Sequence, residues 1–145
     1  MGRACRFSRC TFVVPTSARK CDRAPTRGGI VTAHPVVHAE IRSGDPDATR
    51  DFYSALFGWT YSEGAFPGYT FVDTGVEGAL PTAIGPVQGG TDAVLFFVGV
   101  EDVEATLARA EELGGTIIQP AQQVPGVTFG VLADAQGHAV GVAAN

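Results

Sequence analysis

Two stretches of this chain, DPDATRDFYSALFG (residues 45–58) and DVEATLARAEELGG (residues 102–115), begin with aspartate and end with glycine, 57 positions apart. An aspartate side chain can accept a hydrogen bond from a backbone N–H of the first helical turn, and a glycine readily adopts the left-handed conformation that ends a helix. Pro46 suits the first helical position. Both stretches are therefore predicted to be helices. Apolar residues at helical spacing give each one an apolar face, formed by Ala48, Phe52 and Leu56 in the first and by Val103, Leu107 and Ala110 in the second.

Each predicted helix follows one predicted strand and precedes three more. The strands are expected at residues 35–41, 59–63, 69–74 and 79–84 in the first copy, and at 92–100, 116–119, 127–133 and 138–143 in the second. This repeated βαβββ order predicts an α+β fold of two tandem βαβββ modules, which form a curved mixed sheet around a cleft with the helices outside. The modules span about residues 35–86 and 92–144 of a single domain, residues 34–145.

The charge of the chain is unevenly distributed along it. Residues 1–30 carry seven Arg or Lys and one Asp, whereas residues 31–145 carry three Arg and fourteen Asp or Glu. The body is thus acidic, at 3 − 14 = −11, and nucleic acid is not an expected partner because an acidic surface repels phosphates. No apolar run approaches the roughly 20 residues of a membrane helix, so no membrane association is expected either. All three cysteines lie in the basic part, and the expected location is the cytoplasm.

Residues 1–33 form a basic leader that does not share the pattern of the body. Their Arg- and Ser-rich composition resembles an organelle transit peptide. The preferred interpretation is a disordered extension, or one translated from a start codon assigned too far upstream.

The order of elements, with FYSALFGW (residues 52–59) after the first strand and FGVLADAQGHAVGV (residues 129–142) near the end, resembles the vicinal oxygen chelate superfamily. That superfamily includes glyoxalase I, bleomycin-resistance proteins and extradiol dioxygenases. The resemblance covers residues 35–144 and implies a glyoxalase-like domain that pairs as a homodimer.

The resemblance also implies four strand positions that bind one divalent metal ion in the metal-dependent members. His38 matches the first of them, whereas Leu95 and Gly141 stand at two others. The remaining position falls within residues 79–84, which contain no His, Glu, Asp or Gln. Only a shift in register could bring Glu77, just before this strand, to that position. A catalytic divalent ion usually takes at least three protein ligands, so no metal or other cofactor is expected in the family manner.

Alternation along the strands instead predicts a small-molecule site. His38 and Glu40 share one strand face, and small residues around Gly141 are expected to leave space beside an apolar wall. Tyr69 and Phe71 share a parity, but their face stays open. The predicted ligand-binding residues are His38, Glu40, Tyr69, Phe71, Leu95, Phe97, Ala139 and Gly141.

Three functions remain open at this point. The preferred one is binding of a small, partly apolar organic molecule without a catalytic metal, similar to the bleomycin-resistance-type sequestering proteins. The second is a metal-dependent lyase, isomerase or dioxygenase with a rearranged ligand set. The third is a metal-free enzyme in which His38 or Glu40 transfers a proton, a role that an apolar surrounding would favour.

Overall fold

The computed structural model describes residues 33–64, 66–87 and 89–144. Contacts divide the chain into the units Met1–Val31 and Thr32–Asn145, and the fold described below belongs to the second unit. The prediction for the basic leader lies outside the described residues, apart from Ala33. Among the described residues, no helix is long and apolar enough to cross a membrane.

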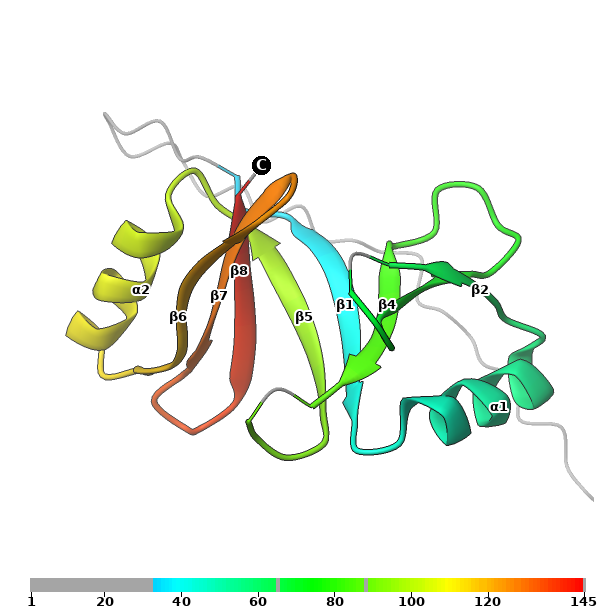
Figure 1. Ribbon diagram of the computed structural model, residues 1–145. Coiled ribbons are helices and arrows are strands. Elements are labelled where there is room, and N and C mark those ends of the chain that lie inside the picture. The colour runs from blue at the N-terminus through cyan, green and yellow to red at the C-terminus, as the bar shows by residue number, and fades with distance from the viewer. Residues whose placement is uncertain (1–32, 65, 88, 145) are drawn as a thin grey trace, which may run out of the picture. The chain divides into compact units, whose positions relative to one another are not determined.

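The elements follow the predicted order (Figure 1). The first module contains β1 (Val36–Ser43), α1 (Pro46–Phe57), β2 (Thr60–Glu63), β3 (Thr70–Asp73) and β4 (Thr82–Pro86). The second contains β5 (Ala93–Gly99), α2 (Val103–Glu112), β6 (Thr116–Val124), β7 (Val127–Ala133) and β8 (Ala139–Ala144).

The helix boundaries arise from the predicted caps. Asp45 accepts a hydrogen bond from the backbone N–H of Ala48 at 3.0 Å, and Asp102 accepts one from Ala105 at 2.9 Å. Gly58 ends α1 with a φ of 71°, a backbone conformation that side chains with a Cβ rarely adopt.

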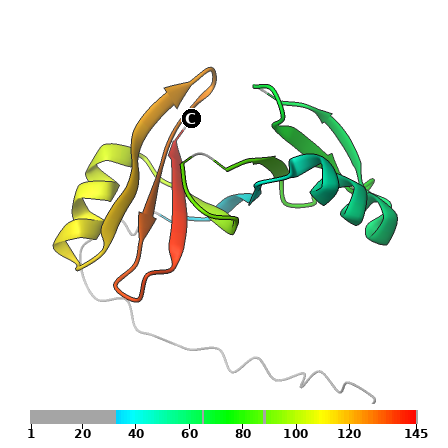
Figure 2. The same ribbon diagram turned by 60° about the horizontal axis from the view of Figure 1, so that its bottom comes forward.

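The eight strands of the described residues form one sheet in the order β2-β3-β4-β1-β5-β8-β7-β6. Within each module the first and last strands pair in parallel, β1 with β4 and β5 with β8, whereas β1 and β5 join the modules through an antiparallel ladder. Figure 2 shows the remaining strands of the two modules on either side of this central pair. The predicted fold class, two βαβββ modules in a curved mixed sheet, is confirmed.

The second module places apolar residues on both faces of the sheet. On the outer face, Val103 and Leu107 of α2 pack against Val142 of β8. On the inner face, Leu95 and Phe97 of β5 pack against Val131 of β7. The expected parity of β5 and β8 is confirmed, because Ala139 and Ala143 join the inner cluster while Val142 lies in the outer one.

Helix α1 is less well covered than its apolar stripe suggests. Phe52 is 60% exposed and Leu56 is 58% exposed, and no residue of α1 is buried. Helical spacing therefore predicted which residues share a face, but not that this face stays open to solvent in the single chain.

Strand β6 is longer than predicted, because it continues through Pro120 to Val124. Its ladder with β7 is irregular between Ile117 and Gln119 and again between Gln119 and Gln122. A proline is tolerated here because β6 is the edge strand of the sheet and the irregularities interrupt its pairing. The sequence reading ended this strand at Gln119 because a proline and polar residues follow.

The expected space beside Gly141 is absent. A Cβ built on Gly141 would lie 2.3 Å from Cδ1 of Phe97, because the Phe97 ring covers the glycine of the neighbouring strand. The ring of Phe97 thus fills the volume that a side chain at position 141 would take. The expectation of space for a ligand beside Gly141 is wrong.

We predict that Gly141→Ala destabilises the protein by about 1–3 kcal/mol, the usual cost of inserting a methyl group into a filled core. Urea unfolding measures this change. Gly90→Ala is the matched control, because a Cβ at Gly90 meets nothing within 4 Å and its φ is not left-handed. Equal stabilities of the two variants would show that Phe97 does not occupy this space.

Candidate functional site

A cavity of about 570 Å³ opens on the inner face of the sheet. Both modules contribute to its wall, which is mostly apolar and contains a compact group of polar side chains. Its volume lies in the range of cavities that hold small organic ligands. The lining residues are Ala33, His34, Pro35, Val37, His38, Glu40, Arg42, Phe66, Tyr69, Phe71, Phe97, Gly99, Val100, Glu101, Val124, Pro125, Val127, Phe129, Ala143 and Ala144.

The polar group is centred on β1. His38, Glu40 and Arg42 alternate along this strand and all line the cavity. Sequence reasoning missed Arg42 because it ended the strand at Ile41. Continuing the same alternation by one step was the signal that could have found it.

Glu40 and Arg42 form a buried ion pair. The Nε of Arg42 donates to Oε1 of Glu40 at 2.5 Å, and the two residues are 8% and 7% exposed, respectively. The Nη1 of Arg42 also donates to Oε1 of Gln119 on β6 at 3.2 Å. Arg42 therefore links the first module to the far edge of the second.

Gln119 reaches Arg42 because of the irregular pairing of β6. In a regular strand Gln119 and Gln122, three positions apart, would point to opposite faces. Here both lie opposite inner-face residues of β7, and the Nε2 of Gln119 donates to Oε1 of Gln122 at 3.0 Å. No alternation pattern in the sequence signals this pair, because bulges redirect side chains.

Tyr69 joins the polar group from the first module. Its hydroxyl donates to Oε2 of Glu40 at 3.4 Å and lies 3.1 Å from Nε2 of His38. The ring is held between two glycines, because a Cβ built on Gly64 or on Gly85 would lie 2.6 Å from a Tyr69 ring carbon. The face of Tyr69, left open by the sequence, is thus the inner one.

Burial shifts the pKa values of His38 and Tyr69 in the direction that favours their uncharged forms. It lowers the pKa of the His38 imidazole, an effect that the nearby charge of Glu40 opposes. It also raises the pKa of the Tyr69 hydroxyl, and the charge of Glu40 adds to that effect. At neutral pH the imidazole of His38 and the phenol of Tyr69 are therefore both uncharged, next to the Glu40–Arg42 ion pair.

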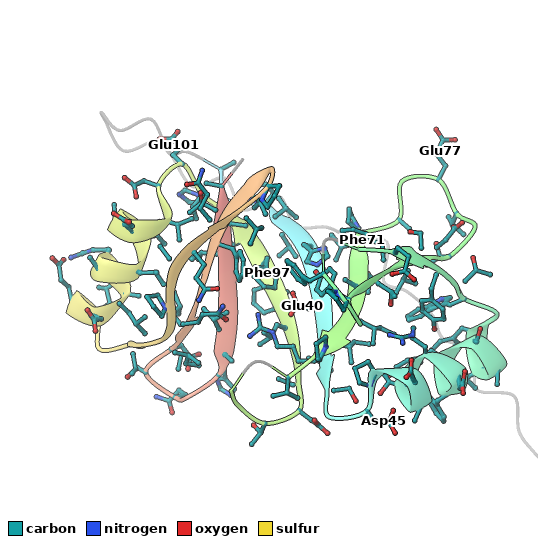
Figure 3. All side chains as sticks on the ribbon, in the orientation of Figure 1. Glu40, Asp45, Phe71, Glu77, Phe97 and Glu101 are labelled. Carbon is teal, nitrogen blue, oxygen red and sulfur yellow. The ribbon has the colours of Figure 1, made fainter. Side chains whose placement is uncertain are left out.

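Five of the eight predicted ligand-binding residues line the cavity: His38, Glu40, Tyr69, Phe71 and Phe97. Phe97, Glu40 and Phe71 lie close together between the two halves of the sheet (Figure 3). The structure does not bring Leu95, Ala139 and Gly141 to the cavity wall. Leu95 is buried in the inner-face cluster, Ala139 packs against that cluster, and the ring of Phe97 covers Gly141.

The donor set does not fit a metal ion. Over the described ranges, no group of three or more His, Cys, Asp or Glu residues could hold one. Glu40 is committed to Arg42, and Glu77 lies on the exposed β3–β4 connection away from Glu40 (Figure 3). The non-donor residues at the other family positions, Leu95 and Gly141, are packed in the interior.

Comparison with known sequences identifies the family. The family described as "Glyoxalase/Bleomycin resistance protein/Dioxygenase superfamily" matches residues 36–142. Two curated relatives named "Putative glyoxylase CFP32", from Mycobacterium bovis and Mycobacterium tuberculosis, are each 26% identical over 113 residues. Each match covers 71% of this chain and 42% of the relative, so the chain spans less than half the length of these relatives.

Solved structures share the fold at low sequence identity. A glyoxalase/bleomycin resistance protein/dioxygenase superfamily member from Vibrio splendidus superposes with a TM-score of 0.54 and 13% identity, covering 78% of this chain and 100% of that one. A structure described as an NAD-dependent benzaldehyde dehydrogenase from Legionella pneumophila gives a TM-score of 0.55 and 15% identity, covering 74% and 96%. These likenesses support the architecture alone.

We predict that His38 makes folding less favourable in acid. Its folded pKa lies below the unfolded value of about 6.5, so below that pH the unfolded chain binds a proton that the folded protein resists. The free energy of unfolding should therefore fall between pH 7.5 and pH 5, and His38→Asn should reduce that fall.

Urea unfolding at both pH values measures this effect. His34→Asn is the control, because His34 is exposed. The same pH dependence in wild type and His38→Asn would contradict the assignment.

Proposed function

Because the chain belongs to the glyoxalase/bleomycin resistance protein/dioxygenase superfamily, we propose that its inner-face cavity binds a small, mostly apolar organic molecule without a metal ion held in the family manner. The observation that carries this proposal is the cavity itself. Its 570 Å³ are enclosed mainly by apolar side chains around one compact polar cluster, the usual construction of a small-molecule site. A sequestering role of the bleomycin-resistance type requires binding and no reaction. The cytoplasmic location stays a prediction.

A metal-free proton transfer is the second candidate function. The observation in its favour is the contact of Tyr69 with both His38 and Glu40 at the cavity wall. A neutral imidazole can accept a proton from a ligand, and a neutral phenol can donate a hydrogen bond to a developing oxyanion. Exchange of a ligand C–H proton with solvent deuterium, lost in His38→Asn, would distinguish this enzyme from a binding protein.

We also propose that the chain forms a homodimer through the outer side of β5 and the open face of α1. Val94 of β5 is 74% exposed, and Phe96, Phe52 and Leu56 are exposed as well. Large exposed apolar areas commonly mark protein interfaces. A twofold dimer is the most frequent closed assembly and would cover this surface with a second copy.

We predict that the cavity binds N-phenyl-1-naphthylamine, an uncharged dye that fluoresces in apolar surroundings. Ala143→Leu should weaken binding at least about tenfold, because the larger side chain enters the cavity that Ala143 lines. Ala108→Leu, on the exposed side of α2, is the matched control. Fluorescence titration gives both affinities, and equal affinities would place the binding elsewhere.

We predict that the purified protein contains no stoichiometric transition metal, because His38 is the only family ligand position occupied by a donor residue. Elemental analysis of wild type and His38→Asn measures this directly. About one zinc, nickel, manganese or iron ion per chain in wild type, lost in His38→Asn, would instead support a metal-dependent enzyme with a rearranged ligand set.

We predict a mass in solution of twice the 15.0 kDa chain at micromolar concentration. Val94→Asp should shift this mass to that of the monomer, since it places a charge in the proposed interface. Val76→Asp, at an exposed apolar residue of the β3–β4 connection, should leave the dimer intact. Light scattering distinguishes these outcomes, and a monomeric wild type would exclude the dimer.

A further inference from the structure

We propose that the ligand class of the inner-face cavity is an uncharged, planar aromatic molecule that carries one hydroxyl or carbonyl group. This inference rests on the proposed binding function and adds the chemistry that the cavity selects. Three independent features of the wall support it: its aromatic rings, its charge balance and the place of its hydrogen-bonding groups.

The rings of the wall form one continuous series across both modules. Phe66 contacts Tyr69, and Tyr69 contacts Phe71, with ring centroids 5.1 and 5.6 Å apart and the rings edge to face. His38 then connects Phe71 to Phe97, at 6.5 and 5.6 Å. Phe97 in turn contacts Phe129 of the second module at 6.3 Å. A planar aromatic ligand can extend this pattern of edge-to-face and offset contacts, whereas a saturated ligand of equal size gains only burial.

Phe71 indicates that the series is incomplete. It lies on the inner face among these rings, yet 43% of its surface is exposed. The neighbouring rings Tyr69 and Phe97 are better covered, and Phe97 is fully packed over Gly141. A ligand that covers Phe71 would remove its apolar surface from water and complete the aromatic wall.

The charges of the cavity disfavour an ionic ligand. Inside it, the carboxylate of Glu40 is already paired with the guanidinium of Arg42. An anion would have to compete with Glu40 for Arg42, and a cation would have to compete with Arg42 for Glu40. Glu101, the other acidic residue of the lining, is exposed to water, where its attraction for a cation is weak. A charged ligand would therefore lose its hydration, and the described lining residues offer no unpaired buried counter-charge to replace it.

The hydrogen-bonding groups limit the ligand to a small polar substituent. The hydroxyl of Tyr69 and the Nε2 of His38 lie 3.1 Å apart in the middle of the aromatic series, and both residues line the cavity. A ligand hydroxyl or carbonyl oxygen placed beside them can exchange hydrogen bonds with either group. The remainder of the molecule would then contact phenyl rings on both sides.

Competition against N-phenyl-1-naphthylamine at pH 7.5 tests the inference with naphthalene-sized probes. The probes are 2-naphthol, naphthalene, naphthalene-2-carboxylate, 2-(aminomethyl)naphthalene as its cation, and the saturated alcohol decahydro-2-naphthol. We expect 2-naphthol to bind about three- to tenfold tighter than naphthalene, the value of one net hydrogen bond. We expect it to bind at least about tenfold tighter than either ion and about threefold or more tighter than the saturated alcohol.

Two variants assign these preferences to residues. Tyr69→Phe should reduce the preference for 2-naphthol over naphthalene, because it removes one of the two groups that can hydrogen-bond with the ligand oxygen, while naphthalene still binds. Phe71→Leu should bring those of 2-naphthol and decahydro-2-naphthol together. Phe52→Leu on α1, the same substitution at an exposed residue outside the cavity, should change neither ratio.

The outcomes separate this inference from the proposed function. If the dye binds but an ionic or saturated probe displaces it as well as 2-naphthol does, the ligand class is wrong and the binding function stands. If neither the dye nor any probe binds to wild type, the proposed function is wrong and this inference fails with it.

Discussion

The buried ion pair between Glu40 and Arg42 is the constraint on which the site depends. Two opposite charges on one strand face, almost out of water, are tolerable only when each stays paired and hydrogen-bonded. Tyr69 from the first module and Gln119 from the second supply the additional hydrogen bonds. The pair therefore couples the two halves of the sheet at the strand where they meet, and loss of either partner would leave an uncompensated buried charge.

Aromatic rings packed over glycines set the shape of the cavity around this pair. The ring of Phe97 covers Gly141, and the ring of Tyr69 lies between Gly64 and Gly85. In the second module this packing closes the inner face at Gly141, where the alternation along the strands predicted open space. In the first module it holds the Tyr69 hydroxyl against His38 and Glu40. Phe71 and Ala143 remain on the cavity wall, together with the polar side chains of His38, Glu40, Arg42 and Tyr69.

The same features that distinguish this chain from the metal-dependent members of the superfamily also favour the binding of an organic ligand. Leucine and glycine replace donor residues, and the carboxylate on β1 pairs with arginine. In the polar cluster that results, the charges of Glu40 and Arg42 balance each other and His38 is uncharged. Aromatic rings surround this cluster, and the remaining acidic residue of the cavity wall, Glu101, is exposed. Such a surface is suited to recognising an organic ligand by shape and one hydrogen bond. The contact of Tyr69 with His38 and Glu40 is the feature that favours proton transfer as the second candidate function.

The sequence by itself determined the two modules, the strand and helix order, the helix caps and the inner-face parity of His38, Glu40 and Phe97. Those features follow from local signals: capping residues, glycines and the spacing of apolar side chains. Only the tertiary structure decided that Gln119 meets Arg42, that Phe97 fills the space at Gly141 and that α1 stays uncovered. The physical reason is that these contacts join residues far apart in the chain. Arg42 and Gln119 lie 77 positions apart, and they meet because bulges in β6 interrupt the regular alternation of side chains. The space at a glycine likewise depends on whether a ring from a neighbouring strand covers it.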